Sequence, residues 1–184
     1  MQLDYWKQRW KEGRTGWHLS EVNPKLIEYW PQLDIAAGST IFVPLCGSSL
    51  DIYWLAEQGF NVFGVDASPI AVGNIVEDDC IDVQCQDFFK LDHEPFMAWY
   101  DRAALVALTP RERPLYFSKL SKLLAIGAKG LLVSFEYPKG HRSGPPFSVN
   151  REEISQLCND NFRYTEIARE GDLEVEVIYE LERI

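Results

Sequence analysis

The stretch FVPLCGSSLDIYWLAEQGFNVFGVD, residues 42–66, decides the predicted fold. It begins with an apolar run that ends at Gly47 and continues with apolar residues at helical spacing. A second apolar run then ends in an acid, Asp66. A strand, a helix and a second strand in succession are typical of a parallel sheet covered by helices. We therefore predict strands at residues 41–45 and 61–65, with a helix at residues 50–58 between them.

Three further apolar runs predict the other parallel strands, and these runs end at Cys85, Asp101 and Glu136. The last of them, residues 131–136, begins without alternation, so we expect it to be buried on both faces. From Leu173 onward apolar and acidic side chains alternate with a period of two, which indicates a half-exposed strand. Together with residues 162–168 this strand predicts an antiparallel hairpin at the end of the chain.

Capping residues predict the helices that separate these strands. Ser68, followed by a proline, opens a helix that we expect to run to about Val76. Further helices are expected to open near Pro114 and at Asn150. The predicted fold class is α/β and Rossmann-like, with a mostly parallel central sheet flanked by helices and closed by the hairpin.

The length of 184 residues predicts a single domain over residues 1–184, of which residues 1–38 form an N-terminal lid segment. With 46% hydrophobic and 25% charged residues, the composition is that of an ordinary globular protein. Apolar runs such as Gly130 to Phe135 are far too short to span a membrane, and the first residues do not resemble an export signal. We expect a cytoplasmic protein and a monomer.

The charge pattern argues against several partners. The net charge of −10, from 28 acids and 18 bases, repels nucleic-acid phosphates and anionic lipid, so neither nucleic acid nor a membrane is expected to bind. Four cysteines lack the Cys-x-x-Cys spacing, which favours free thiols and leaves a Cys80–Cys85 disulfide as the alternative. Three histidines without a ligand motif predict no metal site.

The spacing of Gly47 and Asp66 predicts a nucleoside ligand. An acid about 20 residues after a glycine turn is typical of a carboxylate that accepts hydrogen bonds from ribose hydroxyls. The triple glycine that a pyrophosphate requires is missing, so a dinucleotide is disfavoured. S-adenosylmethionine has a ribose but no phosphate and therefore fits. Asp87 and Phe88, after the third strand, are expected to meet its adenine.

A purely structural reading of the same residues stays open. Gly47 is then only a turn glycine, Asp66 caps a helix beside Ser68, and Asp87 is a solvated loop acid.

Several motifs spread along the chain resemble the thiopurine S-methyltransferase family, especially its bacterial branch. They are WKQRW at 6–10, TGWH at 15–18, VPLCGSSLD at 43–51, DRAALVAL at 101–108, FEYP at 135–138 and GPPFSV at 144–149. The resemblance implies a class I methyltransferase fold and methyl transfer from S-adenosylmethionine to the sulfur of a small thiol. The resemblance also implies that selenium and tellurium compounds can be methyl acceptors.

The resemblance further implies roles for individual residues. Those expected to bind the cofactor are Trp10, Leu45, Gly47, Asp66, Asp87, Phe88 and Arg102. Trp17 is expected to cover the acceptor, and Arg102 to be catalytic as well.

The chain departs from the family pattern at four places. Asp66 stands where relatives normally have Glu, and Ser48 stands where bacterial relatives often have Lys. The stretches at 76–83 and 169–173 are shorter than in the family, and the second lacks a basic segment on the acceptor side. These departures affect the acceptor more than the cofactor.

Arg102 is the predicted cation for an acidic thiol, because a guanidinium stays charged and can hold a thiolate. The structural alternative is an ion pair of Arg102 with Asp101 or another acid. Two other functions stay open. One is methyl transfer to another small nucleophile, including oxygen and nitrogen, and the other is a sensor that binds S-adenosylmethionine without catalysis.

Overall fold

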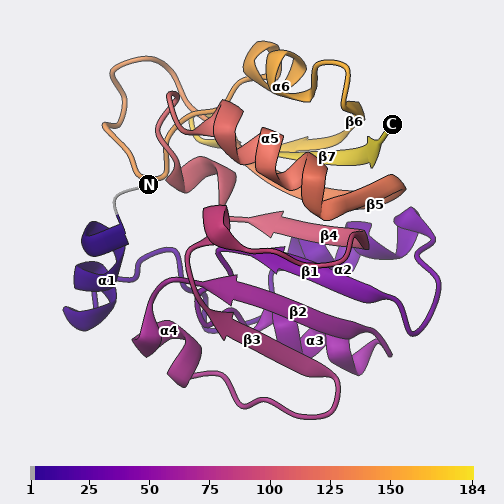
Figure 1. Ribbon diagram of the computed structural model, residues 1–184. Coiled ribbons are helices and arrows are strands. Elements are labelled where there is room, and N and C mark those ends of the chain that lie inside the picture. Colours follow the sequence, from indigo (N-terminus) through magenta and orange to yellow (C-terminus); the bar gives the residue numbers. More distant parts are fainter. Residues whose placement is uncertain (1–2) are drawn as a thin grey trace. The chain divides into compact units, whose positions relative to one another are not determined.

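A computed structural model describes residues 3–184, and the contacts of the chain divide it into two units, Met1–His93 and Glu94–Ile184. Each unit contains its own strands and helices (Figure 1). We refer to them as the first and the second unit. Residues 1 and 2 of the expected lid segment lie outside the described residues, and the single domain over residues 1–184 stays a prediction.

Three parallel strands form the sheet of the first unit, in the order β3-β2-β1. Their bounds are β1 Thr40–Pro44, β2 Asn61–Asp66 and β3 Ile81–Cys85. Because the three strands are parallel, their carboxyl ends lie at one edge of this sheet. Residues 41–44 and 62–65 are buried throughout, as expected for strands covered on both faces.

Short helices surround this sheet. Figure 1 shows α3, Asp51–Glu57, against one face of β2 and β3, and α4, Pro69–Gly73, beyond the arrowhead of β2. The N-terminal segment contains α1, Leu3–Lys11, α2, Pro24–Tyr29, and the 3-10 helix η1, Trp30–Leu33. Helix α1 contacts α4, so the N-terminal segment reaches the edge where the strands end. A further 3-10 helix, η2, follows β3 at Phe88–Lys90.

Four strands form the sheet of the second unit, in the order β4-β5-β7-β6. Their bounds are β4 Phe96–Arg102, β5 Leu124–Glu136, β6 Phe162–Glu170 and β7 Val175–Arg183. Strands β4 and β5 are parallel, and the β6–β7 hairpin adds to β5 in antiparallel orientation. The predicted α/β fold class with its antiparallel hairpin is therefore confirmed.

The helices of the second unit connect these strands. They are η3, Leu105–Ala107, α5, Arg113–Leu123, and α6, Arg151–Cys158. Figure 1 shows α5 and α6 on the same side of the β5, β6 and β7 strands. The start of α5 near Pro114 and the cap at Asn150, which accepts a hydrogen bond from the amide of Glu153, were both predicted and are confirmed.

Two predicted boundaries are wrong. Helix α4 ends at Gly73 rather than near Val76, because the glycine and Asn74 after it are poor helix formers. Strand β5 begins at Leu124 rather than at residue 131. Gly127 has a φ of +82°, and the register of β5 against β4 shifts between Phe96 and Ala98. The first part of β5 is therefore irregular, and its sequence does not show the pattern of a strand.

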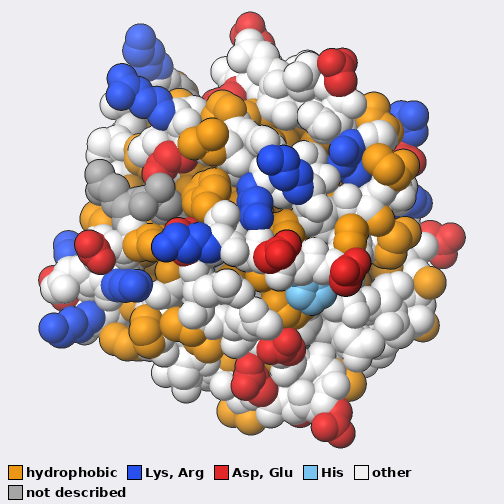
Figure 2. All heavy atoms as spheres, in the orientation of Figure 1, with side chains coloured by type: hydrophobic (Ala, Val, Ile, Leu, Met, Phe, Trp, Pro, Cys, Tyr) orange, Lys and Arg blue, Asp and Glu red, His pale blue; other side chains and the backbone are white. Residues whose placement is uncertain are grey.

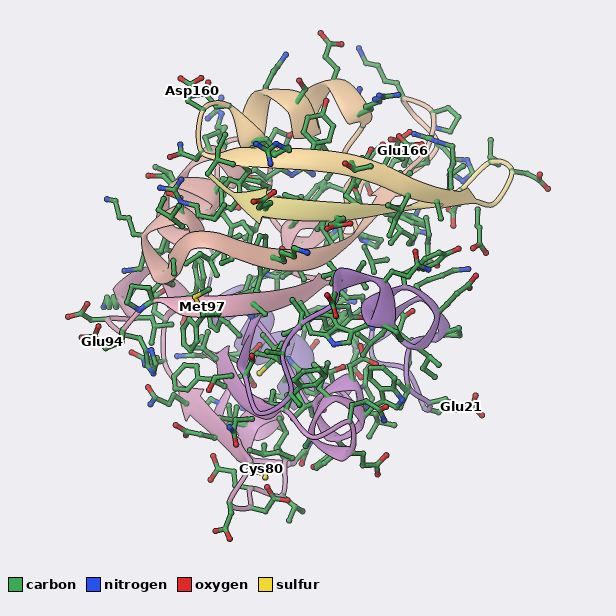
Figure 3. All side chains as sticks on the ribbon, turned by 90° about the vertical axis from the view of Figure 1, so that its right-hand side faces the viewer. Glu21, Cys80, Glu94, Met97, Asp160 and Glu166 are labelled. Carbon is green, nitrogen blue, oxygen red and sulfur yellow. The ribbon has the colours of Figure 1, made fainter. Side chains whose placement is uncertain are left out.

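The surface of the described residues is mixed in charge. On the face drawn in Figure 2, acidic and basic side chains are interspersed with hydrophobic ones. Within residues 3–184, no helix is long and apolar enough to cross a membrane. All four cysteines lie in this part of the chain as free thiols, and Cys80 is exposed in the turn before β3 (Figure 3).

Candidate functional site

A hydrogen bond joins the two residues that define the predicted nucleoside site. The backbone amide of Gly47, just after β1, donates to Oδ2 of Asp66 over 3.0 Å. Asp66 is the last residue of β2, so the bond connects neighbouring strands at the carboxyl edge of the sheet. The amide of Ser68 donates to Oδ1 of Asp66 over 2.8 Å. Both oxygens of Asp66 are therefore fixed in direction by backbone groups.

The electrostatics of Asp66 follow from this position. Burial raises the pKa of the Asp66 carboxyl above its usual range, and the amides of Ser68 and Gly47 act to lower it. Each carboxylate oxygen has two acceptor lone pairs, so the two amides leave half of the acceptor capacity of Asp66 for a ligand. Ser68 is the residue that caps α4, because its hydroxyl accepts a hydrogen bond from the amide of Ala71 over 3.3 Å.

The turn after β1 has an unusual backbone. Leu45 has a φ of +48° and Gly47 a φ of +57°, both in the left-handed region. For leucine this conformation is strained and persists only where the surroundings impose it. A Cβ built on Gly47 would lie 3.0 Å from Cζ2 of Trp10. Glycine is needed here both for its backbone conformation and for the close approach of this indole.

Trp10 belongs to a cluster of aromatic side chains in the N-terminal segment. Its ring meets that of Trp17 edge to face at 5.9 Å, and Trp17 meets Trp6 in the same way at 5.2 Å. The guanidinium of Arg9 lies 5.3 Å from the centre of the Trp17 ring. Trp10 is buried and Trp17 half-buried, so the structure brings both predicted aromatics together with the glycine turn of β1.

Asp87 and Phe88 lie after β3, at the same edge of the sheet. Oδ1 of Asp87 accepts a hydrogen bond from the amide of Phe89 over 3.1 Å and so caps η2. The ring of Phe88 is fully buried and lies parallel to that of Phe42, with ring centres 6.3 Å apart. The half-buried aromatic at this position is Phe89, whose exposure the sequence pattern did not reveal.

Cys46, in the glycine turn, is not a reactive thiol. Burial, together with the negative charge of nearby Asp66, raises the pKa of Cys46 well above its usual range. A thiol kept protonated in this way is a poor nucleophile. Ser48, where relatives often carry a lysine, is buried.

Arg102 is the last residue of β4 in the second unit, and its side chain is half-buried. The next residue, Ala103, has a φ of +61°. The carboxylate of Asp101 accepts hydrogen bonds from the Tyr116 hydroxyl, 2.6 Å, and from the Leu105 amide, 3.1 Å. The alternative ion pair of Arg102 with Asp101 or another acid stays a prediction. Sequence reasoning missed Tyr116. The one signal was a hydroxyl at a core position of the helix, because a buried tyrosine usually has a hydrogen-bond partner.

Two other arginines near the carboxyl end of β5 are bound by acids. Arg169 contacts Glu136 over 2.8 Å and Glu166 over 2.9 Å, and Figure 3 labels Glu166 on β6. Arg142 contacts Glu174 over 3.0 Å. The charges of Arg142 and Arg169 are therefore offset within the second unit.

The predicted site residues do not line the groove of the second unit, and no metal cluster lies near them among the described residues. This groove lies between α5 and α6 and has a volume of about 660 Å³. Within residues 3–184, no three His, Cys, Asp or Glu side chains come together in a way that could hold a metal ion.

Solved structures define the class of the fold. The chain is similar to the 1,6-didemethyltoxoflavin-N1-methyltransferase of Burkholderia thailandensis, with a TM-score of 0.77 over 98% of this chain and 87% of that one, at 17% identity. It is also similar to a Synechocystis magnesium protoporphyrin IX methyltransferase, with a TM-score of 0.74, covering 99% and 95% at 16% identity. Both were solved with S-adenosylmethionine or its demethylated product bound. The fold is that of the class I S-adenosylmethionine-dependent methyltransferases.

Sequence comparison then defines the family. The sequence model of the thiopurine S-methyltransferase family matches residues 1–80 and 75–181. A thiopurine S-methyltransferase of Xanthomonas campestris is 38% identical, over 96% of this chain and 90% of that protein. One of Pseudomonas fluorescens is 41% identical, over 85% and 80%. The chain belongs to the thiopurine S-methyltransferase family, and it is an S-adenosylmethionine-dependent methyltransferase.

Proposed function

We propose that this enzyme methylates the sulfur of a small-molecule thiol, as the names of its thiopurine S-methyltransferase relatives suggest, and that selenium or tellurium compounds are further acceptors. The observation that carries the donor side is the hydrogen bond from Gly47 to Asp66, which sets a carboxylate beside the glycine turn.

The residues of the first unit fit the donor. Asp66 has two acceptor positions that the amides do not use, and a ribose offers two neighbouring hydroxyl donors. We assign the adenine end to Asp87 and the segment of Phe88 and Phe89 one strand further along the sheet, where the capping carboxylate of Asp87 is next to the half-buried ring of Phe89. Trp10 and Leu45 border the glycine turn and would contact the rest of the cofactor.

The chain needs little chemistry of its own for the transfer. S-adenosylmethionine supplies a methyl group on a positively charged sulfur, which makes the methyl carbon electrophilic. The protein orients the two reactants, and orientation alone accounts for about 7–11 kcal/mol of barrier lowering in well-aligned reactions. The Trp6, Trp10 and Trp17 cluster would exclude water from the donor. Arg102 would hold the acceptor as a thiolate, because its charge does not depend on pH.

We further propose that the enzyme acts in the cytoplasm, as a monomer and without a nucleic-acid partner. The net charge of −10 and the free thiols of Cys80 and Cys85 support this assignment.

The donor assignment is tested by Asp66→Ala. The variant lacks both acceptor positions for the ribose, so we expect saturable binding of S-adenosylmethionine to disappear in calorimetry. Asp82→Ala, which removes an exposed acid from the neighbouring strand β3, is the matched control and should bind as the wild type does. Wild-type affinity in Asp66→Ala would refute the ribose role.

The acceptor assignment is tested with labelled donor and a panel of thiophenol-like thiols, selenite, tellurite, phenols and amines. We expect label on sulfur. In Arg102→Ala, kcat/KM for an ionised thiol should fall about 10- to 100-fold, the usual effect of losing a hydrogen bond to a charged group. Arg163→Ala, an exposed arginine of β6, is the control. Label only on oxygen or nitrogen, or donor binding without any transfer, would favour one of the two other functions.

A further inference from the structure

The end of strand β4 is held by a buried carboxylate. Asp101 is 2% exposed and directly precedes Arg102. Its Oδ1 accepts the amide of Leu105 over 3.1 Å, and its Oδ2 accepts the hydroxyl of Tyr116 over 2.6 Å. Tyr116 is fully buried in α5. Asp101 thus connects three segments, namely the strand, the turn after it and the helix.

The turn that Asp101 closes contains Arg102 and a strained residue. Ala103 has a φ of +61°, a conformation that costs free energy for any residue with a side chain. Such a conformation persists only where surrounding contacts impose it. The bond from Asp101 to the Leu105 amide spans Ala103 and is a contact of this kind.

A buried carboxylate with a tyrosine partner is often less favourable for stability than an apolar pair at the same place. Burying a charged group costs free energy that its hydrogen bonds only partly return, and an apolar pair of similar volume often serves stability as well or better. The residues that follow Tyr116 on the inner face of α5, Leu120 and Leu123, are apolar and buried, while the buried charge before it, Arg113, has its own partner in Glu153. Packing alone therefore does not require a hydroxyl at residue 116.

We infer that Tyr116 is a positioning residue for Arg102. Helix α5 fixes the hydroxyl of Tyr116, the hydroxyl fixes the carboxylate of Asp101, and the carboxylate holds the turn from which Arg102 projects. The inference rests on the proposed function, in which Arg102 binds the acceptor thiolate. It adds a residue of α5 that does not itself touch the acceptor.

The protonation states support this arrangement. Burial raises the pKa of Asp101 to about 6, and its hydrogen bonds from Tyr116 and the turn amides oppose that rise. Burial and the charge of Asp101 raise the pKa of Tyr116 well above its usual range. At neutral pH Asp101 is therefore mostly an acceptor and Tyr116 a donor, as the chain of hydrogen bonds requires.

The test is a double-mutant cycle of Tyr116→Phe and Arg102→Ala, with thiophenol as the acceptor. Phenylalanine keeps the ring of Tyr116 and removes only its hydroxyl. We expect kcat/KM for the thiol to fall about 10-fold in Tyr116→Phe, while the affinity for S-adenosylmethionine in calorimetry stays within 2-fold. In the Arg102→Ala background, Tyr116→Phe should change kcat/KM by less than about 2-fold, because the residue that it positions is gone.

Tyr179→Phe is the matched control. It removes the hydroxyl of another fully buried tyrosine of the second unit, on β7, and should leave kcat/KM unchanged. Circular dichroism checks that each variant is folded. If Tyr116→Phe does not fold, Asp101→Asn replaces it in the cycle and is judged by the same criteria.

The outcomes separate the inference from the proposed function. If Arg102→Ala retains wild-type kcat/KM, the acceptor role of Arg102 is wrong, and with it the reason for positioning this side chain. If Arg102→Ala loses activity but Tyr116→Phe does not, the inference alone is overturned. It is also overturned if the losses multiply in the double variant, since Tyr116 would then act independently of Arg102.

Discussion

Single residues of this protein are constrained by contacts to distant parts of the chain. Gly130 of β5 pairs with Trp99 of β4, and the indole ring covers its α-carbon. A Cβ at Gly130 would lie 2.2 Å from Cδ2 and Cε2 of Trp99. Trp99 is 1% exposed and cannot move outward without leaving the core. Glycine is needed here for space rather than for backbone freedom.

Gly130→Ala should therefore lower the free energy of unfolding by about 1–3 kcal/mol, the usual cost of overpacking a core. Denaturant unfolding followed by circular dichroism measures the change. The matched substitution is Gly73→Ala in α4, where a Cβ meets no atom within 4 Å. That variant should be as stable as the wild type or slightly more stable. An unchanged midpoint in Gly130→Ala would show that Trp99 has room to move.

At the scale of elements, a buried ion pair joins helices α5 and α6. Arg113 is fully buried, and its Nη1 lies 2.7 and 2.8 Å from the two carboxylate oxygens of Glu153. The same guanidinium donates to the backbone oxygens of Leu108 and Ser148. Arg113 thus connects both helices to the segments that precede them. Breaking such a pair leaves a buried charge without compensation.

Glu153→Gln tests this connection. It keeps the shape of the side chain and removes its charge, so we expect a loss of about 2–3 kcal/mol in the free energy of unfolding. This value is below the loss for a fully enclosed pair, because the Glu153 side chain is 27% exposed. Glu152→Gln, at the neighbouring exposed acid of α6, should change it by less than about 0.5 kcal/mol. Equal losses in the two variants would mean that the buried pair contributes no more than an exposed acid.

The pH dependence of stability belongs to the scale of the whole molecule. Burial raises the pKa of Asp101 to about 6 from an ordinary value of 3.8, so the folded chain holds this proton more tightly than the unfolded chain does. The resulting stabilisation is complete below the unfolded pKa and is lost as pH rises through the folded one. This sign is opposite to that of an acid in a salt bridge.

Asp101→Asn removes the titrating group and keeps a side chain of the same shape. Between about pH 4 and pH 7, the free energy of unfolding of the wild type should fall by about 2.5 kcal/mol relative to this variant. The full shift of about two pKa units corresponds to about 3 kcal/mol, but at pH 4 the carboxyl of the unfolded chain is already more than half ionised. Urea unfolding of both proteins across this range measures the difference, and all other acids cancel in it. Parallel pH profiles would contradict the raised pKa.

Much of the fold follows from local patterns, because hydrophobic period and capping act between neighbours in the chain. The run before Gly47, the cap at Ser68 and the alternation after Leu173 each indicate the observed element. The same patterns placed Asp66 at a strand end near Gly47, and the structure joins these two residues by a hydrogen bond. Where local signals conflict, as around Gly127, the prediction missed the start of β5.

The sequence by itself thus determined the order of strands and helices, the class of ligand and the family motifs. Only the tertiary structure decided that Tyr116 bonds to Asp101, that Trp99 covers Gly130 and that Leu45 and Ala103 take left-handed conformations. The physical reason is that these features depend on side chains from separate segments meeting in a packed interior. No pattern within one segment encodes such a meeting.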